Sequence, residues 1–450
     1  MTNRARHLLA ILIFLLLAPP DNSQAGQPET TPLTLVEALN IARHDNTMLQ
    51  ETAAALAAQE EAVHSARAEQ LPKLAASYTY ARLHDAPYAI FGPSRMPVGD
   101  LDHVRWDVTV SQPLFTGFAL TSKRELAALG VEIKDMEQRQ AALEVARQVK
   151  TGYYRILLTE KQQTVANEEV DQLTAHAAEA KLFYEQGLIP YNDLLKSQVG
   201  LADARQTAKR AQSNLAMAKA AFNALLRLPL NQPLEVEAVE TADAARPALP
   251  ELASLQAEAV ERRPERSALQ LAISSAGQAE RLARSAYYPE IGLVGQYERT
   301  GEDWDADTNA YGNWQNTSVA VKAKWTLFEW GKTRAEVSRQ VHQQQGLSAR
   351  LARLEDAIRL EVQQAWLDLS VADENIHTAE ESLAQARENF RITDLQYKES
   401  VATSTDVLDA RTALTRSETN YYGALYGLLT AAADLDRAIG RDDSPATASR

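Results

Sequence analysis

The feature that most constrains the fold of this 450-residue chain is an internal repeat. Tyr184 matches Tyr397 at an offset of 213 positions, whereas Pro72 matches Pro289 at an offset of 217. The difference of four residues places a longer loop in the first copy, between Pro72 and Leu114. Because the period is about 215 residues, the repeated unit is a domain-sized half and not a short solenoid repeat.

The first 25 residues have the organisation of a secretory signal peptide. Arg4 and Arg6 form a basic start, the stretch 8–18 is apolar, and Ser23-Gln24-Ala25 offers a cleavage site between small residues. The apolar run is too short for a membrane-spanning helix. The chain contains no cysteine, which excludes disulfides and a lipid-accepting cysteine after the signal. We therefore expect an exported bacterial protein that is not a lipoprotein.

Composition narrows the class of protein further. The net charge of −14 argues against nucleic acid as a partner. Alanine and glutamine dominate the long segments, while glycine and proline are few and clustered, which indicates long, closely packed helices. The eight histidines are scattered without metal-ligand spacing, and no phosphate loop or nucleophile elbow is present. We predict no cofactor, no metal site and no enzyme activity.

Each half predicts the same order of elements: a medium helix, two strands, a very long helix, a short break and another medium helix. Nothing interrupts the helical pattern between Phe118 and Gly187, or between Gly331 and about Ser400. Each run has about 68 residues, which corresponds to a rod of roughly 100 Å. The second rod carries apolar or small residues at three- and four-residue steps, the pattern of a coiled-coil seam.

The medium helices have lengths that fit beside these rods. The helices predicted over 193–228 and 250–288 together match the length of one rod, and so do those over 405–439 and 35–71. We expect two medium helices, stacked end to end, to lie beside each long helix.

The chain divides into five segments. We assign a signal peptide (1–25), a first repeat (26–226), a proline-rich equatorial linker (227–250), a second repeat (251–440) and a disordered tail (441–450). The linker holds four prolines, which exclude a helix there.

Two stretches in each half alternate between apolar and polar residues. In the clearest of them Val319 and Val321 share one face, while Lys322 and Lys324 occupy the other. About ten residues of this pattern are typical of a membrane-spanning β-strand with one face in lipid and the other in water. An ordinary half-buried hairpin is the alternative. The four candidate strands lie within 74–80, 105–111, 291–298 and 318–327.

Four membrane strands cannot form a barrel within one chain. Unpaired strand edges in lipid cost several kcal/mol for each exposed backbone group, and the smallest known barrels have eight strands. The chain must therefore oligomerise, although periodicity alone does not set the number of copies.

At this point two repeated motifs carry a resemblance to a known family. The corners QPLFTGF (112–118) and WTLFEWGKTRA (325–335) and the tips YEQGLIPYNDLL (184–195) and YKESVATSTDVLDA (397–410) resemble those of the TolC-like outer-membrane efflux factors. The resemblance covers nearly all of the mature chain. It implies a mainly α fold with a membrane β-barrel: a homotrimer whose 12-stranded barrel lies in outer-membrane lipid and continues into a periplasmic tunnel. It also implies a periplasmic adaptor protein and an inner-membrane transporter as partners.

The sequence departs from the family pattern at the corners and at the second tip. Phe118 and Trp330 stand where the family has glycine, and Ser400 is the counterpart of the tip residue Gly187. The arginine that some members carry in the second tip is Ala402 here.

The resemblance also assigns a role to the tips. It implies that Gly187, Leu188, Ser400 and Val401 dock the adaptor, and the departures leave open a divergent type of adaptor.

Asp406 and Asp409 begin the last helix, just after the second tip. Aspartate in a first helical turn caps free amides and interacts favourably with the helix dipole, so capping alone would explain the pair. The resemblance instead places both residues at the periplasmic mouth, where carboxylate rings make a cation-attracting constriction. We expect Asp406 to be the cap and Asp409 the better candidate for the pore.

Tyr397, Asn192 and Asp193 form the candidate gate. The resemblance implies a hydrogen bond from a tyrosine of the second tip to the aspartate of the first, which would hold the mouth closed. The alternative is that Asp193 is an ordinary helix cap and that Tyr397 packs on its own helix.

These features predict an export duct of the bacterial outer membrane, extending into the periplasm, that expels small toxic compounds. A duct for type I protein secretion and a structural coiled-coil envelope protein without a pore are the alternatives.

Overall fold

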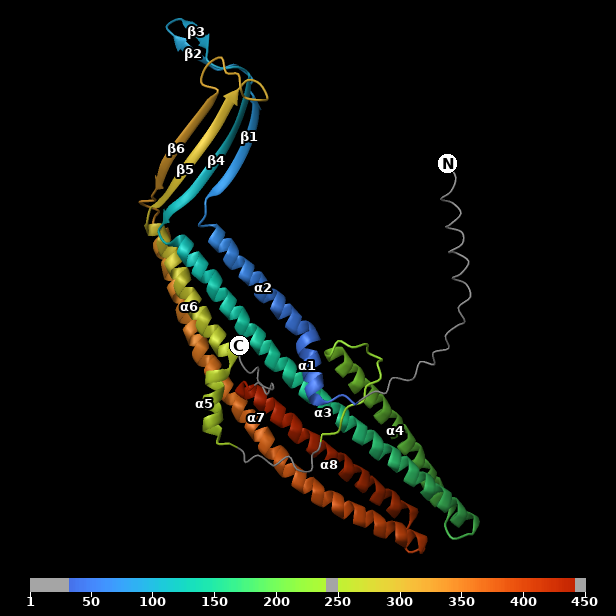
Figure 1. Ribbon diagram of the computed structural model, residues 1–450. Helices are drawn as coiled ribbons and strands as arrows, with labels where there is room; N and C mark the ends of the chain where they lie inside the picture. Colours follow the sequence, from blue (N-terminus) through green and yellow to red (C-terminus); the bar gives the residue numbers. More distant parts are fainter. Residues whose placement is uncertain (1–31, 240–249, 442–450) are drawn as a thin grey trace, which may run out of the picture.

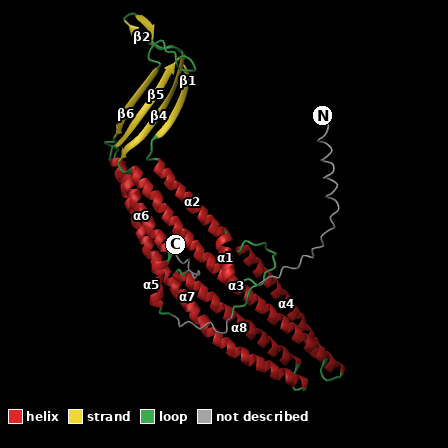
Figure 2. Ribbon diagram, viewed as in Figure 1, coloured by secondary structure: helices red, strands yellow, loops and turns green. Residues whose placement is uncertain are grey.

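A computed structural model describes residues 32–239 and 250–441. The predicted signal peptide, nearly all of the predicted tail and part of the linker lie outside these ranges. The molecule is elongated, with a sheet at one end and long helices over the rest of its length (Figure 1). Strands and helices are completely segregated (Figure 2).

The two repeats have the predicted order of elements. The first contains α1 (Leu35–Asp45), α2 (Thr47–Ala68), β1 (Lys73–Arg82), β2 (Tyr88–Phe91), β3 (Ser94–Pro97), β4 (Asp102–Thr116), α3 (Ala119–Glu185) and α4 (Tyr191–Leu225). The second contains α5 (Leu252–Arg262), α6 (Pro264–Arg284), a 3-10 turn (Ser285–Tyr287), β5 (Glu290–Gly301), β6 (Gln315–Lys324), α7 (Lys332–Lys398) and α8 (Ser404–Ile439). The additional hairpin β2–β3 lies in the longer loop predicted for the first copy.

The prediction of one unbroken medium helix at the start of each repeat is wrong. Asn46 divides the first: its extended backbone ends α1, and its side chain caps α2 by accepting a hydrogen bond from the Met48 N–H (2.9 Å). In the second copy the break falls at Arg263, and Pro264 occupies the first turn of α6, where its missing N–H costs nothing. The two breaks lie at equivalent repeat positions.

The long helices α3 and α7 have 67 residues each, as predicted. In the half next to the sheet the neighbouring helices are α2, α3, α6 and α7, and in the other half they are α4, α3, α8 and α7. None of the helices in the described ranges has an apolar stretch long enough to cross a bilayer.

The medium helices stack end to end, but the predicted pairs are exchanged. The Asn46 side chain donates to the Leu225 carbonyl (3.1 Å), so α4 continues the line of α1 and α2. The Arg263 guanidinium donates to the Ala438 carbonyl (3.1 Å), so α8 continues the line of α5 and α6. Length alone could not distinguish the pairs, because α4 and α8 differ by one residue.

The four predicted membrane strands form one antiparallel sheet in the order β1-β4-β5-β6. The register places Leu74, Val110, Gly295 and Val319 in one row across the sheet. The next row holds Lys73, Ser111, Val294 and Ala320 on the opposite face. One face is therefore mainly apolar and the other mainly polar, and in the described structure the outer edges of β1 and β6 have no partner strand.

Each strand-to-helix corner uses two residues with left-handed backbone. These are Gly117 (φ 61°) with Phe118 (φ 71°), and Trp330 (φ 53°) with Gly331 (φ 82°). A side chain on Gly117 would lie 2.5 Å from the Ser285 carbonyl oxygen, so only glycine fits there. Phe118 and Trp330, the two departures from the family pattern, accept a conformation that costs roughly 1–2 kcal/mol for a residue with a Cβ.

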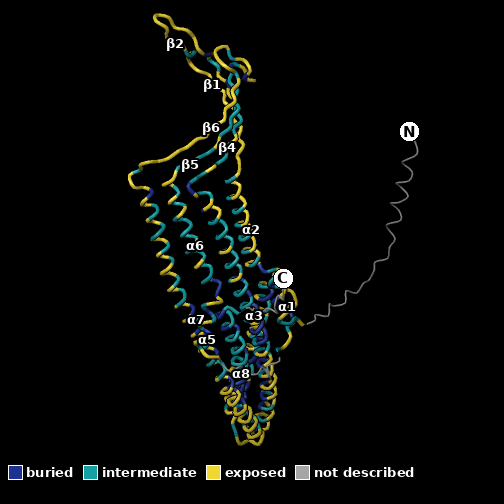
Figure 3. Tube along the Cα trace, turned by 60° about the vertical axis from the view of Figure 1, so that its left-hand side comes forward, coloured by how far each residue is buried: buried dark blue, intermediate teal, exposed yellow. Residues whose placement is uncertain are grey.

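The main core lies at the equator, where the stacked helices meet and buried residues gather (Figure 3). The segment before α1 pairs there with the described part of the linker, Leu33 with Val236. The Tyr153 hydroxyl donates across this joint to the carbonyls of Leu33 (2.9 Å) and Glu237 (2.7 Å). The linker is non-helical over 227–239, as its prolines predict, and it ties the two ends of the first repeat together.

Candidate functional site

The two helical hairpins end side by side, at the end of the molecule opposite the sheet (Figure 1). Gly187 (φ 76°) and Ser400 (φ 60°) occupy the same left-handed position in the two tips. Leu188 and Val401 follow them, and their side chains are 56% and 75% exposed. Ser400 thus preserves the turn that glycine makes in the first tip, at the energetic cost of a Cβ in this conformation.

Asp406 takes part in capping α8: it completes a capping box in which Thr403 is the N-cap residue. The Asp406 carboxylate accepts hydrogen bonds from the Thr403 N–H (2.8 Å) and hydroxyl (2.7 Å), while the Asp406 N–H donates to the Thr403 hydroxyl (3.3 Å). The hydrogen bonds from the hydroxyl and the backbone of Thr403 hold the pKa of Asp406 below its usual value. Asp409 lies one turn further along α8 and is exposed. Both carboxylates are therefore accessible at this end of the molecule.

The predicted hydrogen bond between Tyr397 and Asp193 is not formed within the chain. Tyr397 is 1% exposed and packs against His176 and Phe183 of α3, with ring centroids 4.7 and 5.5 Å apart. Its hydroxyl has no hydrogen-bond partner among the described residues, and burial raises its pKa to about 12. The carboxylate of Asp193 instead pairs with Lys196 at 3.5 Å. Asn192 lies next to it, exposed, in the first turn of α4.

Two other contacts join the hairpins. The His176 Nε2 lies 2.8 Å from the Ser404 hydroxyl in a buried position, which links α3 to the start of α8. The Lys196 ammonium donates to the Thr405 hydroxyl (3.0 Å), which links α4 to α8. Sequence reasoning missed both contacts, because single polar residues at seam positions belong to no motif.

Charged side chains are buried about two turns into α8. Arg411 is 1% exposed, and its guanidinium lies 3.8 Å from the carboxylate of Glu418, too far for a hydrogen bond. The Nε and Nη2 atoms of Arg411 and the Oε2 atom of Glu418 have no hydrogen-bond partner in the described structure. Burial raises the pKa of Glu418 and of Glu169 on α3, and burial lowers the pKa of Arg411. The seam between α3 and α8 therefore holds poorly satisfied charges near the tips.

Lowering the pH should weaken the packing at the tips through His176. Burial lowers the pKa of His176, so its neutral form is favoured in the folded state. The stability that neutral His176 contributes is fully present above the pKa of about 6.5 that histidine has in the unfolded chain. It is lost as the pH falls through the lower pKa of His176 in the folded protein. Protonation of Glu169 and Glu418, whose pKa values are raised in the folded protein, stabilises the fold as the pH falls. The effect of His176 is therefore measured against a variant that lacks only this histidine.

We expect the wild-type protein to lose more thermal stability than the His176→Gln variant between pH 7 and pH 5. Glutamine can keep a hydrogen bond to Ser404 but cannot be protonated in this range. Melting temperatures of both proteins at the two pH values measure the effect. Parallel pH profiles would show that His176 does not titrate at the tips.

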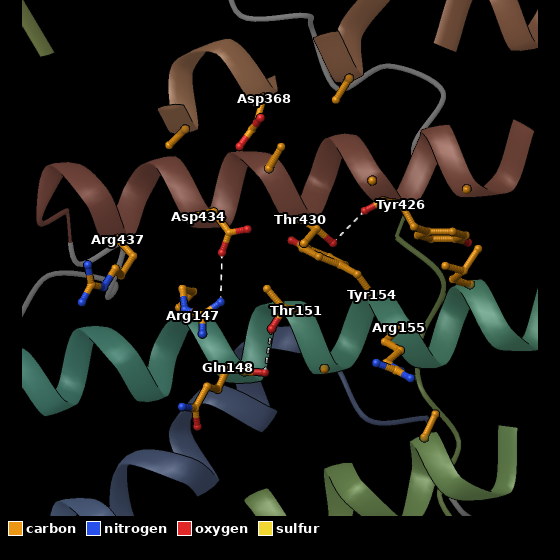
Figure 4. A pocket seen from close by; sticks show the side chains of 18 of the residues that line it. Arg147, Gln148, Thr151, Tyr154, Arg155, Asp368, Tyr426, Thr430, Asp434 and Arg437 are labelled. Atoms are coloured by element: carbon orange, nitrogen blue, oxygen red, sulfur yellow. Dashed lines mark hydrogen bonds and ion pairs between the residues drawn. The ribbon is translucent and has the colours of Figure 1, made fainter. Parts of the chain in front are cut away.

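A groove of about 1910 Å³ runs along the hairpins, lined by residues of α3, α4, α7 and α8. Figure 4 shows its polar walls, where Arg147 on α3 faces Asp434 on α8 at 3.0 Å. Arg437, further along α8, pairs with Glu361 on α7. Charges of both signs line the groove, and those of Arg147 and Arg437 pair with carboxylates on neighbouring helices.

Within 32–239 and 250–441, no group of three or more histidine, cysteine, aspartate or glutamate side chains is arranged to hold a metal ion.

Both repeats match the model of a known protein family. The family model described as outer membrane efflux protein matches residues 38–226 and 255–441. The chain therefore belongs to the outer membrane efflux protein family. The predicted family, the outer-membrane location and the role as an export duct that extends into the periplasm are confirmed.

Individual relatives are distant in sequence but similar over nearly their whole length. The chain is 23% identical over 414 residues to the outer membrane efflux protein BepC of Brucella suis, covering 88% of this chain and 85% of that one. A membrane protein from Pseudomonas aeruginosa has the same fold (TM-score 0.78, 17% identity, 90% and 92% coverage). So has the CmeC outer membrane channel of Campylobacter jejuni (TM-score 0.75, 15% identity, 90% and 85% coverage).

Proposed function

We propose that three copies of this chain assemble into one continuous duct, with a 12-stranded barrel in the outer membrane and a helical tunnel in the periplasm. The observation that carries the proposal is the sheet, which has one apolar face, one polar face and two unpaired edges. In lipid those edges must be paired. Pairing β6 of one copy with β1 of the next satisfies both edges and leaves none at closure.

In the hairpin half of the molecule, α7 and α4 form the two outer edges of the helical layer, and each exposes apolar side chains. On α7, Leu360, Leu367 and Val371 are 68%, 44% and 55% exposed, and the helical period places them opposite the side that packs on α8. On α4, Val199 and Met217 are 60% and 67% exposed, opposite the side that packs on α3. These apolar stripes support packing of α7 of one copy against α4 of the next.

The tips then surround the periplasmic mouth, which gives the predicted site residues their roles. Asp406 and Asp409 supply six carboxylates per trimer to the constriction. The contacts of His176 with Ser404 and of Lys196 with Thr405 hold the hairpins together in the closed state. Asn192, Asp193 and Tyr397 belong to the same gate, with Tyr397 as the buried packing element.

Removing the acidic pair should reduce block of the duct by multivalent cations. In the Asp406→Asn, Asp409→Asn double variant the ring at the mouth is neutral, so a trivalent cation added on the periplasmic side should bind at least tenfold more weakly. Single-channel conductance with and without the cation measures this. Unchanged block would leave Asp406 with its role in the capping box only and would exclude Asp409 from the constriction.

The exposed tip residues fit docking of a periplasmic adaptor that recruits an inner-membrane transporter. Leu188 and Val401 lie at equivalent positions of the two tips, so a trimer presents six apolar points beside Gly187 and Ser400. We propose that the complete assembly expels small toxic compounds.

A strain that lacks this protein tests the proposal in cells. The wild-type gene should restore resistance to toxic compounds, and the Leu188→Asp, Val401→Asp double variant should not, although it still assembles as a trimer. Full resistance with the double variant would contradict docking at the tips. No resistance with the wild-type protein would contradict efflux of small compounds.

A further inference from the structure

A band of lysines lies at the end of the sheet that joins the helices. Lys73 is the first residue of β1, and Lys322 and Lys324 end β6, so all three lie where the strands meet the helical layer (Figure 1). All three side chains are exposed. They occur in a chain whose net charge is −14, so the band runs against the overall charge of the protein.

The strand register places the three lysines on the polar face. Lys73 pairs with Ser111, and Lys322 pairs with Gly292. The register of β4 and β5 puts these partners on the face opposite the row of Leu74, Val110, Gly295 and Val319. In a closed barrel the apolar face meets lipid, so the lysines face the lumen.

The band differs from the rest of the polar face in how its charges are satisfied. Further from the helices, Arg105 pairs with Glu298 at 2.5 Å, and Asp107 accepts hydrogen bonds from Ser77 (2.6 Å) and Thr109 (3.0 Å). In the described structure the three lysines form no ion pair or hydrogen bond. Lys73 interacts electrostatically with Glu69, but that carboxylate is already paired with Lys123 at 2.9 Å. Glu290 lies opposite Lys324 in the register without forming an ion pair with it. The band therefore keeps a net positive charge.

Closure of the ring would complete the band. Lys73 lies on one edge strand of the sheet and Lys322 and Lys324 lie on the other, at the same end and on the same face. Pairing of β6 with β1 of the next copy brings the lysines of two chains together. Nine lysines and three copies of Glu290 would then encircle the lumen.

We propose that this lysine band (Lys73, Lys322 and Lys324) makes the base of the barrel selective for anionic solutes, such as compounds that carry carboxylate, sulfonate or phosphate groups. The inference rests on the proposed trimeric duct. A ring of fixed positive charge around an aqueous passage raises the local concentration of anions and lowers that of cations. The effect is strongest at low ionic strength, where the screening length is of the order of 10–30 Å.

The test compares reversal potentials of single channels in a tenfold potassium chloride gradient at low salt. We expect the Lys73→Gln, Lys322→Gln, Lys324→Gln variant to lower the permeability ratio of chloride to potassium by about threefold or more. The matching Lys→Arg triple variant should keep the wild-type value, and Glu290→Gln should shift it towards chloride. The acidic mouth contributes equally to all of these proteins and cancels in the comparison.

The outcomes separate the lysine band from the duct itself. Conducting channels with the same reversal potential in the wild type and the Gln triple variant would overturn the inference, and would instead indicate lysines that face lipid headgroups. A wild-type protein that forms no channels would contradict the proposed trimeric duct. If the triple variant does not assemble, opposite shifts in Glu290→Gln and in the Lys322→Gln, Lys324→Gln double variant support the band. No shift in either of these variants overturns it.

Discussion

Replacing Arg411 by alanine is expected to destabilise the protein by about 3–5 kcal/mol, because it removes the buried positive charge that faces the carboxylates of Glu418 and Glu169. The Arg411 guanidinium is 1% exposed and lies 3.8 Å from the Glu418 carboxylate. The other cation beside Glu418, Arg387 at 3.7 Å, has a side chain that is 59% exposed, so solvent screens its charge. Arg411 also opposes the rise that burial causes in the pKa of Glu169. Loss of this one charge therefore affects two acidic groups in the seam between α3 and α8.

Thermal melting of the purified protein measures this effect, and Arg416→Ala is the matched control. Arg416 is exposed on the same helix, so its loss should change stability by less than about 0.5 kcal/mol. A second comparison uses Arg411→Met with Glu418→Leu, which replaces the poorly satisfied pair by apolar groups. Removing two charges from water costs about as much free energy as their attraction gains. The free energy of unfolding of this double variant should therefore be close to that of the wild type or higher. Equal stability of Arg411→Ala and the wild type would contradict the account of this seam.

Placing two carboxylates on the free edge of α7 is expected to abolish the trimer. Leu367 and Val371 lie one turn apart on the side opposite α8, in the proposed seam with α4 of the next copy. Burying an unpaired carboxylate costs several kcal/mol, and the Leu367→Asp, Val371→Asp variant would do so twice in each of three seams. The monomer should keep its helices, because neither side chain contributes to the buried core within the chain.

Val401→Asp provides the control for this experiment. It makes the same kind of chemical change at a side chain that is 75% exposed, but at a hairpin tip instead of a helix edge. The mass of each particle in mild detergent should show a monomer for the α7 variant and a trimer for the control. A trimer of unchanged stability in the α7 variant would place the interface elsewhere.

The internal repeat explains why so much of the architecture could be predicted from sequence. Strong periodic signals occur twice, so the strands of 291–298 and 318–327 support the weaker ones of the first copy. The hairpin tips were also predictable, because their motif occurs twice at one offset, and Gly187 and its counterpart Ser400 both adopt left-handed backbone.

The medium helices show where periodicity is insufficient. The helical pattern continues across Asn46 and Arg263, and the chain bends there because Asn46 caps α2 and bonds to α4. Pro264 was the available signal, since proline favours the first turn of a helix. Because the two copies are equivalent, a break before Pro264 also predicts a break at the matching position of the first copy, Asn46.

The gate shows the limit of motif reasoning. Tyr397 was identified from its tip motif, but its side chain turns to α3, where packing on His176 and Phe183 buries the ring. His176 and Arg411 belong to no motif. Only the three-dimensional packing of α3 against α8 shows that each of them is buried in this seam. Contacts between helices far apart in sequence are set by side-chain packing, which a one-dimensional pattern does not specify.

The central claim is that the open sheet of one chain is completed by two others to form a conducting duct. The most direct test is to determine the mass of the protein purified from outer membranes in mild detergent and to insert the same particle into a planar bilayer. We expect a particle of three chains that conducts ions. A folded, stable monomer, or a trimer that never conducts, would contradict it.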